Sequence, residues 1–121
     1  MNVLLVDDEP SMLRMMKIML QSSGFNVFDA LHAKDAMLLA EENRVDVLVT
    51  DVVLDENDTD GFTLARSILA GYPNTPVVFI SGFPTDFESK RHEFGRCTFL
   101  QKPFQKTQLV QAIVELSTQT A

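Results

Sequence analysis

The 121-residue sequence lacks the features of a membrane, disulfide-rich or nucleic-acid-binding protein. Its single cysteine, Cys97, has no partner for an internal disulfide, which is consistent with a reducing compartment. Its apolar runs are too short to span a bilayer, and Asp7 ends the first run too early for a signal peptide. With 10 basic and 17 acidic residues the net charge is −7, which argues against nucleic-acid binding. These absences favour a cytoplasmic globular protein with no direct contact to membrane or nucleic acid.

What the chain does contain is an alternation of short apolar runs with longer amphipathic ones. The apolar runs predict five strands, at residues 2–6, 25–30, 45–50, 76–80 and 97–101. Helical spacing between them predicts helices, from Pro10 to before Gly24 and over 33–43, 61–70, 84–94 and 109–116, of which 84–94 is the weakest. Strands that alternate with helices predict an α/β domain over residues 1–121, with a parallel sheet covered on both faces.

The first predicted helix carries a stripe of methionines at helical spacing. They are Met12, Met15, Met16 and Met19. Methionine fills irregular gaps between packed elements, so we expect this stripe to face the core rather than a metal or a partner.

Polar side chains follow four of the five predicted strands. Asp7 and Asp8 follow the first strand, Asp51 the third, Ser81 the fourth and Lys102 the fifth. The carboxyl ends of parallel strands share one edge, where open α/β sheets bind their ligands, so we expect one common cleft. Three neighbouring carboxylates repel one another, and a hard cation such as Mg²⁺ relieves the repulsion. Such a site suits phosphoryl transfer, with Asp51 as nucleophile and with Ser81 and Lys102 on the phosphoryl oxygens.

Each of these pieces taken alone has a more ordinary interpretation. A pair of aspartates is commonly a turn or a helix N-cap, and an aspartate after a strand is commonly a loop residue. A Ser-Gly pair usually makes a turn, and a Lys-Pro pair usually ends a strand. The hypothesis of a site rests on their conjunction at one predicted edge.

The stretches VLLVDDEP, LVTDVVL, DGFTLA, VVFISG and FLQKPF together resemble the receiver domain of two-component response regulators. The resemblance covers nearly the whole chain. It implies a flavodoxin-like, doubly wound (βα)₅ sandwich with strand order 2-1-3-4-5. It also implies that Asp51 accepts a phosphoryl group from the phosphohistidine of a sensor histidine kinase or a phosphotransfer protein.

The same resemblance implies roles for the other residues of the site. Asp8 and Asp51 would bind Mg²⁺ directly, Asp7 mostly through water, and the backbone carbonyl of Val53 would complete the protein ligands. In this family the peptide corresponding to Lys102-Pro103 is typically cis, which would direct the lysine inward.

The resemblance further implies a switch. On phosphorylation Ser81 would move toward the phosphoryl group, and Phe99 would swing inward from the fifth strand. The signal would pass through the face made by the fourth helix, the fifth strand and the fifth helix to an output domain or protein that the sequence does not identify. A dimer that forms on phosphorylation is one form that this output could take. The ordinary interpretation of Phe99 is a strand-core residue, and it lacks the hydroxyl of a tyrosine.

Two departures from the family pattern fall in the segment after Asp51. Leu54 is followed by Asp55 rather than by proline, and the run to Gly61 is about two residues longer than the commonest pattern. The acidic loop 54–60 could tune magnesium affinity, repel an anionic phosphodonor or lie in solvent, and we favour solvent.

Three competing functions make different demands on the sequence. A phosphatase of the haloacid dehalogenase class needs a second acid two residues after its nucleophile, and that position is Val53. A nucleotide or flavin module would want a glycine- or hydroxyl-rich first loop, whereas DDEPS is acidic. A degenerate receiver that binds partners without phosphorylation is disfavoured by the intact set of acids, serine and lysine. We therefore predict a phosphoacceptor switch that catalyses only its own phosphorylation and dephosphorylation, rather than a turnover enzyme.

Overall fold

The computed structural model describes residues 1–54 and 59–118, in which strands and helices alternate along the chain. The strands are β1 (Asn2–Val6), β2 (Asn26–Ala30), β3 (Val47–Asp51), β4 (Val77–Ser81) and β5 (Cys97–Gln101). The helices are α1 (Pro10–Ser22), α2 (Ala33–Glu42), α3 (Gly61–Gly71), α4 (Phe87–Lys90) and α5 (Lys106–Thr118), with a 3₁₀ turn, η1 (Arg91–Glu93), after α4. The five predicted strands are confirmed, with small shifts of their bounds.

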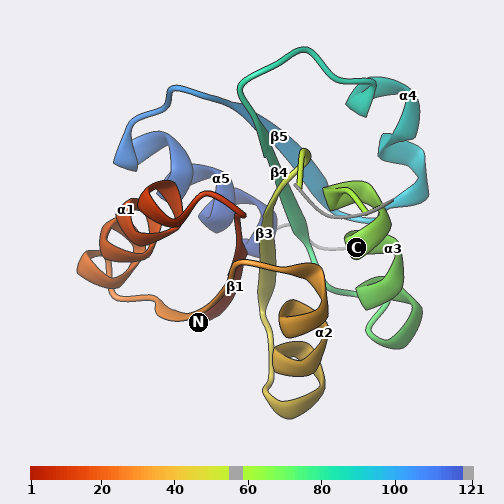
Figure 1. The fold of residues 1–121 in the computed structure, drawn as a ribbon, viewed down its shortest axis with the longest axis horizontal. Coiled ribbons are helices and arrows are strands. Elements are labelled where there is room, and N and C mark those ends of the chain that lie inside the picture. The colour runs from red at the N-terminus through yellow and green to blue at the C-terminus, as the bar shows by residue number, and fades with distance from the viewer. Residues whose placement is uncertain (55–58, 119–121) are drawn as a thin grey trace.

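The five strands form one parallel sheet in the order β2-β1-β3-β4-β5, which confirms the order that the family resemblance implies. In Figure 1, α1 and α5 lie on one side of this sheet, and α2, α3 and α4 lie on the other. All the strands run the same way, so their carboxyl ends meet at one edge of the sheet.

Alternate residues of the central strands face two separate cores. In β1, Val3 and Leu5 pack with α1 and α5, whereas Leu4 and Val6 pack with α2 and α3. Strands β3 and β4 are buried at every position, as strands covered on both faces must be. Two-sided burial therefore explains why these strands read as continuous apolar runs in the sequence.

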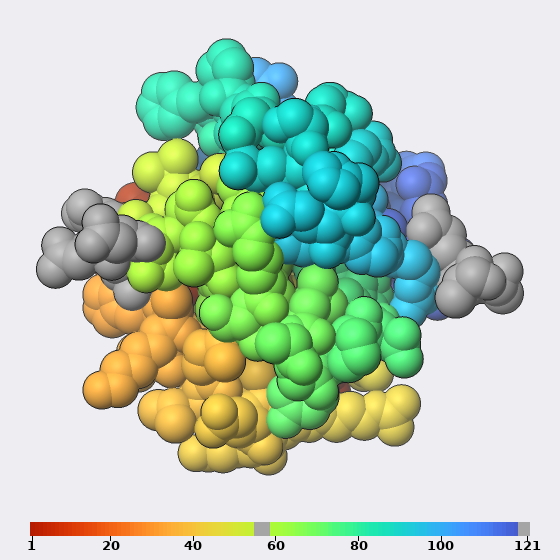
Figure 2. All heavy atoms as spheres, turned by 90° about the vertical axis from the view of Figure 1, so that its right-hand side faces the viewer, coloured from red at the N-terminus to blue at the C-terminus, as the bar shows by residue number. Residues whose placement is uncertain are grey.

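Five phenylalanines form an aromatic cluster on the α2–α3–α4 side of the sheet. Neighbouring ring centroids lie 4.9 to 6.1 Å apart in the group Phe62, Phe79, Phe87, Phe94 and Phe99. Figure 2 views the surface above this cluster, where α3 lies between α2 and the α4 segment. The cluster links α3, β4, β5 and the α4 segment through ring contacts.

Two expectations about helices need correction. The predicted helix at 84–94 is a four-residue α4 followed by η1, held to the core by Phe87 and Phe94. Two buried anchors with polar residues between them do not make a continuous apolar face for a longer helix. In α1, Met16 is buried but Met15 is 42% exposed, because Met15 lies at the edge of the stripe. Met12 and Met19 pack partly against the core.

Two helices that begin near the carboxyl ends of the strands, α1 and α3, have side chains that cap their N-termini. Glu9 caps α1 by accepting hydrogen bonds from the N–H groups of Ser11 and Met12, and Pro10 opens the helix. Asp60 caps α3 by accepting the N–H of Thr63 at 2.8 Å. Among the helices of residues 1–54 and 59–118, none is both long and apolar enough to cross a bilayer.

Candidate functional site

The carboxyl ends of β1, β3 and β5 bring three carboxylates and one ammonium together. Asp7 and Asp8 follow β1, Asp51 is the last residue of β3, and Lys102 follows β5. One carboxylate oxygen from each aspartate lies within 4.8 Å of the others. The cluster that the strand-end rule predicts is therefore present at the predicted edge.

Lys102 connects two of these carboxylates. Its Nζ donates to Oδ2 of Asp51 at 2.8 Å and lies 3.3 Å from Oδ2 of Asp7. Burial opposes the charge on Lys102, but the hydrogen bond and charge of Asp51, together with Asp7, outweigh it and raise the lysine pKa. Lys102 is therefore an ammonium at neutral pH. The Lys102-Pro103 peptide is cis, as the family resemblance implies.

Asp7 is the most enclosed of the three carboxylates, with no exposed surface. Its Oδ1 accepts the N–H of Glu9 at 2.9 Å. Burial raises the pKa of Asp7 above the ordinary value, although the Glu9 N–H and Lys102 act in the opposite direction. Ionisation of Asp7 is therefore less favourable in the folded protein than in water.

Asp51 is held by its own strand end. Its Oδ1 accepts the N–H of Val53 at 3.2 Å, its backbone carbonyl accepts the hydroxyl of Thr50 at 3.0 Å, and only 7% of the residue is exposed. Carboxylate oxygens from three acids at this separation form the hard donor set that Mg²⁺ prefers. The residues present thus fit the cation that the sequence predicts.

Ser81 lies on β4, which pairs with β3, and Phe99 lies on β5, the next strand beyond β4. Ser81 is fully buried at the end of β4, and its Oγ accepts the N–H of Phe83 at 3.1 Å. Phe99 is half-buried in β5, and its ring stacks on Phe87 of α4 with centroids 5.6 Å apart. Val53, in contrast, is 54% exposed just beyond Asp51.

Sequence reasoning missed two residues at this edge. Glu9 belongs to the acidic DDE run, yet its side chain caps α1, and the following Pro10 is the signal for that cap. Gly61 was read only as the start of a helix. Its N–H donates to the carbonyl of Val52 at 2.8 Å, which joins the start of α3 to the end of β3.

The acidic loop 54–60 is described in part. Leu54 is buried, and Asp60 is the cap of α3 rather than a member of the carboxylate cluster. Asp55, Glu56 and Asp58 lie outside the described residues, so the interpretations of their role stay predictions.

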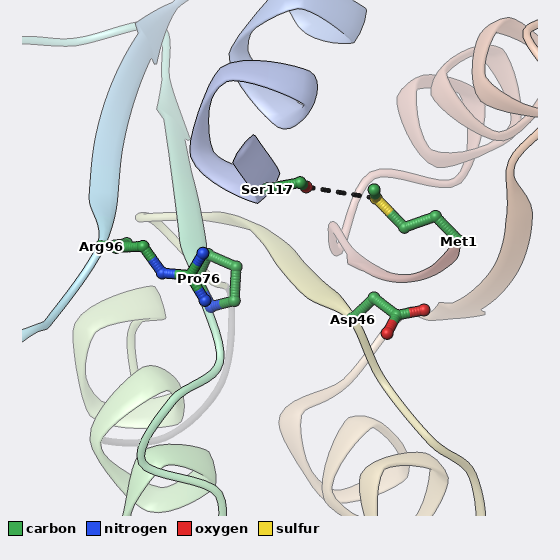
Figure 3. Close-up of a pocket in the computed structure, with 5 residues that line it drawn as sticks. All are labelled: Met1, Asp46, Pro76, Arg96 and Ser117. Atoms are coloured by element: carbon green, nitrogen blue, oxygen red, sulfur yellow. Dashed lines mark hydrogen bonds between the residues drawn. The ribbon is translucent and has the colours of Figure 1, made fainter. Parts of the chain in front are cut away.

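A hollow at the opposite, amino-terminal edge of the sheet has a different character. It has a volume of about 320 Å³ and is lined by Met1, Asp46, Pro76, Arg96 and Ser117, as Figure 3 shows. The hydroxyl of Ser117 lies 3.3 Å from the sulfur of Met1 across it. None of the predicted site residues lines this hollow.

Comparisons with known proteins agree with this geometry. The family model of the response regulator receiver domain matches residues 3–114. A response regulator of Rickettsia conorii named as NtrX-like is 32% identical over 111 residues, which are 91% of this chain and 23% of that protein. The transcriptional regulatory protein GlrR of Escherichia coli K12 is 31% identical over 122 residues, 99% of this chain and 27% of GlrR.

A solved structure matches over nearly the whole of both chains. The response regulator receiver protein from Sinorhizobium medicae superimposes with a TM-score of 0.85 at 30% identity, covering 96% of this chain and 93% of that one. The chain spans about a quarter of the length of the two regulators above.

Proposed function

The chain belongs to the receiver domain family of response regulators, and on that premise we propose that Asp51 is its phosphoacceptor. Receiver domains are two-component signalling domains, and Mg²⁺-dependent phosphoryl transfer is a general property of the family. One observation carries the proposal: Asp51 ends β3 where oxygens of Asp7 and Asp8 lie within 4.8 Å and Lys102 bonds its Oδ2. We assign residues 1–121 to the receiver domain.

The chemistry follows from the groups around Asp51. As the phosphoacceptor, Asp51 would attack the phosphorus of a phosphohistidine on a sensor histidine kinase or phosphotransfer protein through one carboxylate oxygen. A P–O bond forms as the P–N bond breaks, and the leaving histidine nitrogen keeps the electron pair and takes a proton. Lys102 and Ser81 donate hydrogen bonds to phosphoryl oxygens, which spreads the developing charge.

We assign the magnesium ligands to the same cluster. Asp8 and Asp51 would hold the ion directly, Asp7 would hold it mostly through water, and the carbonyl of Val53 would complete the set. The ion supplies the positive charge that offsets the carboxylates and the incoming phosphoryl group. The three carboxylate oxygens within 4.8 Å of one another, which come from Asp7, Asp8 and Asp51, support this assignment.

The domain acts as a switch rather than as a classical turnover enzyme. It promotes its own phosphorylation and dephosphorylation, whereas Val53 stands where a phosphoesterase would need a general acid. Phosphorylation draws Ser81 toward the phosphoryl group and Phe99 inward, which breaks the stack of Phe99 on Phe87. Because Phe87 lies in α4, this movement changes the face formed by α4, β5 and α5.

The changed face acts on an output domain or protein, or pairs with a second copy after phosphorylation. We propose that any nucleic-acid contact is made by another domain or protein, and the net charge of −7 supports this. We also propose that the domain acts in the cytoplasm, away from the membrane surface.

The test is phosphorylation by acetyl phosphate, read as the intact mass with and without Mg²⁺. We expect one added phosphoryl group that requires both Mg²⁺ and Asp51, so that Asp51→Asn removes it. A matched control is Asp46→Asn, which changes a carboxylate at the other edge of the sheet and should leave the mass increase intact. If acetyl phosphate did not phosphorylate the wild-type protein and beryllofluoride did not bind to it, the proposal would be wrong.

A further inference from the structure

The first residue of α3 lies unusually close to the phosphoacceptor strand. The N–H of Gly61 donates to the carbonyl of Val52 at 2.8 Å. A β-carbon placed on Gly61 would overlap the backbone carbonyl oxygen of Asp51 and would lie 2.9 Å from the Cα of Val52. These neighbours are backbone atoms, which cannot rotate away as the end of a side chain can. A side chain at position 61 therefore has to push the end of β3 and the start of α3 apart.

Other glycines of the chain do not share this constraint. A β-carbon on Gly71, at the other end of α3, would meet no atom within 4 Å. One on Gly82, directly after Ser81, would meet only the Cβ of Lys102 at an ordinary 3.8 Å. The close approach is thus specific to the place where α3 begins against Asp51.

The same contact fixes both ends of the segment after the phosphoacceptor. The hydrogen bond from Gly61 to Val52 joins the residues on either side of 53–60. The N–H of Val53 in turn donates to Oδ1 of Asp51. Val52 is covalently bonded to Asp51 and to Val53, and Val53 is hydrogen-bonded to the Asp51 carboxylate. A shift of Val52 or of the Asp51 carbonyl therefore also moves the reacting carboxylate.

We propose that Gly61 is a positioning residue for phosphorylation: by having no side chain, it lets α3 fix the backbone of Asp51 so that the carboxylate faces Lys102. This inference rests on the proposed role of Asp51 as phosphoacceptor. A misplacement of a reacting group on the order of 1 Å can slow a reaction by about 10²-fold. A local movement at the end of β3 relieves the overlap that the added methyl group of an alanine causes. The variant therefore folds but reacts slowly.

The experiment compares two glycine-to-alanine substitutions in one helix. Gly61→Ala and Gly71→Ala are phosphorylated with acetyl phosphate and Mg²⁺, and the rate constant per folded molecule is measured by intact mass. We expect Gly61→Ala to be at least about tenfold slower than wild type and Gly71→Ala to stay within about twofold. Absence of phosphorylation in wild type and Gly71→Ala alike would count against the role of Asp51. A wild-type rate in Gly61→Ala would overturn the role of Gly61 alone.

A third variant separates positioning from general loosening of α3. Asp60→Ala removes the cap on Thr63 and destabilises the start of the helix without placing a methyl group against Asp51. We expect it to lower the melting temperature while its rate per folded molecule stays within about threefold of wild type. An equal loss of rate per folded molecule in Asp60→Ala and Gly61→Ala would show that Gly61 acts only through the stability of the start of α3. This result would contradict the proposal.

The geometry of the acceptor can also be read without turnover. Fluorine NMR of beryllofluoride with Mg²⁺ reports a complex that mimics the phosphoryl group on the acceptor aspartate, and we expect Gly61→Ala to bind it at least about tenfold more weakly than Gly71→Ala. The double variant Gly61→Ala/Gly71→Ala offsets lost stability, because alanine favours the helix more than glycine does. Failure of this double variant to fold in the cold with Mg²⁺ would contradict the local relief that the proposal requires.

Discussion

The two edges of the sheet carry charge in different ways. At the amino-terminal edge, Asp46 accepts the N–H of Asn2 at 2.7 Å and pairs with Nε of Arg44 at 3.4 Å. Arg96 donates to the carbonyl of Leu116 at 3.0 Å, which fastens the end of α5. Each of these three charged groups has a partner of opposite sign or a backbone group.

At the carboxyl-terminal edge, three carboxylates share their surroundings with one ammonium. Lys102 contacts Asp7 and Asp51 together, and burial still leaves the pKa of Asp7 raised. Negative charge therefore exceeds positive charge among these residues of the carboxyl-terminal edge, in contrast to the pairs at the amino-terminal edge. A local conflict of this kind at one edge, beside balanced pairs at the other, is what a site for a cation and a phosphoryl group requires.

The largest expected effect comes from removing the ammonium of Lys102, which Asp7 and Asp51 share. Without Mg²⁺, Lys102→Met should lower the free energy of unfolding by about 1–3 kcal/mol, because Asp7 and Asp51 lose their shared cation. Arg44→Met at the balanced edge should change it by less than about 0.5 kcal/mol, since 88% of the Arg44 side chain is exposed. Urea unfolding measures both values.

Magnesium sharpens the same contrast. It should restore much of the stability of Lys102→Met and leave Arg44→Met unaffected beyond the wild-type gain. Equal losses in the two variants without Mg²⁺ would mean that the carboxyl-terminal edge is no less balanced than the amino-terminal one.

A smaller effect should change sign between the edges when one substitution is made at each. At neutral pH without Mg²⁺, Asp7→Asn should stabilise the protein by on the order of 1 kcal/mol, whereas Asp46→Asn should destabilise it by a similar amount. Asp7→Asn removes a charge that burial opposes, and Asp46→Asn weakens the contacts to Arg44 and Asn2. Urea unfolding of both variants gives the two signs.

The gain in Asp7→Asn should depend on pH. Because burial raises the pKa of Asp7 in the folded protein, the folded protein holds this proton more tightly than the unfolded chain does. The penalty for ionised Asp7 is absent below the unfolded pKa and grows as pH rises through the folded pKa. A gain that stayed constant from acid to neutral pH would contradict this origin.

The sequence predicts the fold and the edge of the site well for a physical reason. Period and length separate short buried strands from amphipathic helices, and parallel strands bring Asp7, Asp51, Ser81 and Lys102 to one edge. The short α4 was harder to predict, since Phe87 and Phe94 alone give no clear period.

Details that depend on packing in three dimensions could not be predicted in the same way. The bonds from Lys102 to two carboxylates depend on the path of the chain after β5, and the stack of Phe99 on Phe87 joins residues from separate elements. The approach of Gly61 to Asp51 is likewise a distance between backbones, which no pattern of residue types reports.

The smallest expected effect concerns a pair outside both edges, where one cation meets one carboxylate in solvent. Nε and Nη2 of Arg66 in α3 donate to the two oxygens of Glu93 in η1, each at 3.0 Å. The hydrogen bond and charge of Arg66 lower the pKa of Glu93 in the folded protein. The pair therefore stabilises the fold above the unfolded pKa of Glu93 and loses this effect as pH falls through the folded pKa. Glu93→Gln should therefore lower the melting temperature slightly at neutral pH and not in acid, and salt should reduce the difference.

Glu88→Gln is the matched control. Glu88 contacts Arg91 on its own segment, and 80% of its side chain is exposed, so the substitution should have less effect. A difference in melting temperature that did not respond to pH would show that Glu93 acts through packing. The pair could then not be compared with the crowded carboxylates beside Lys102.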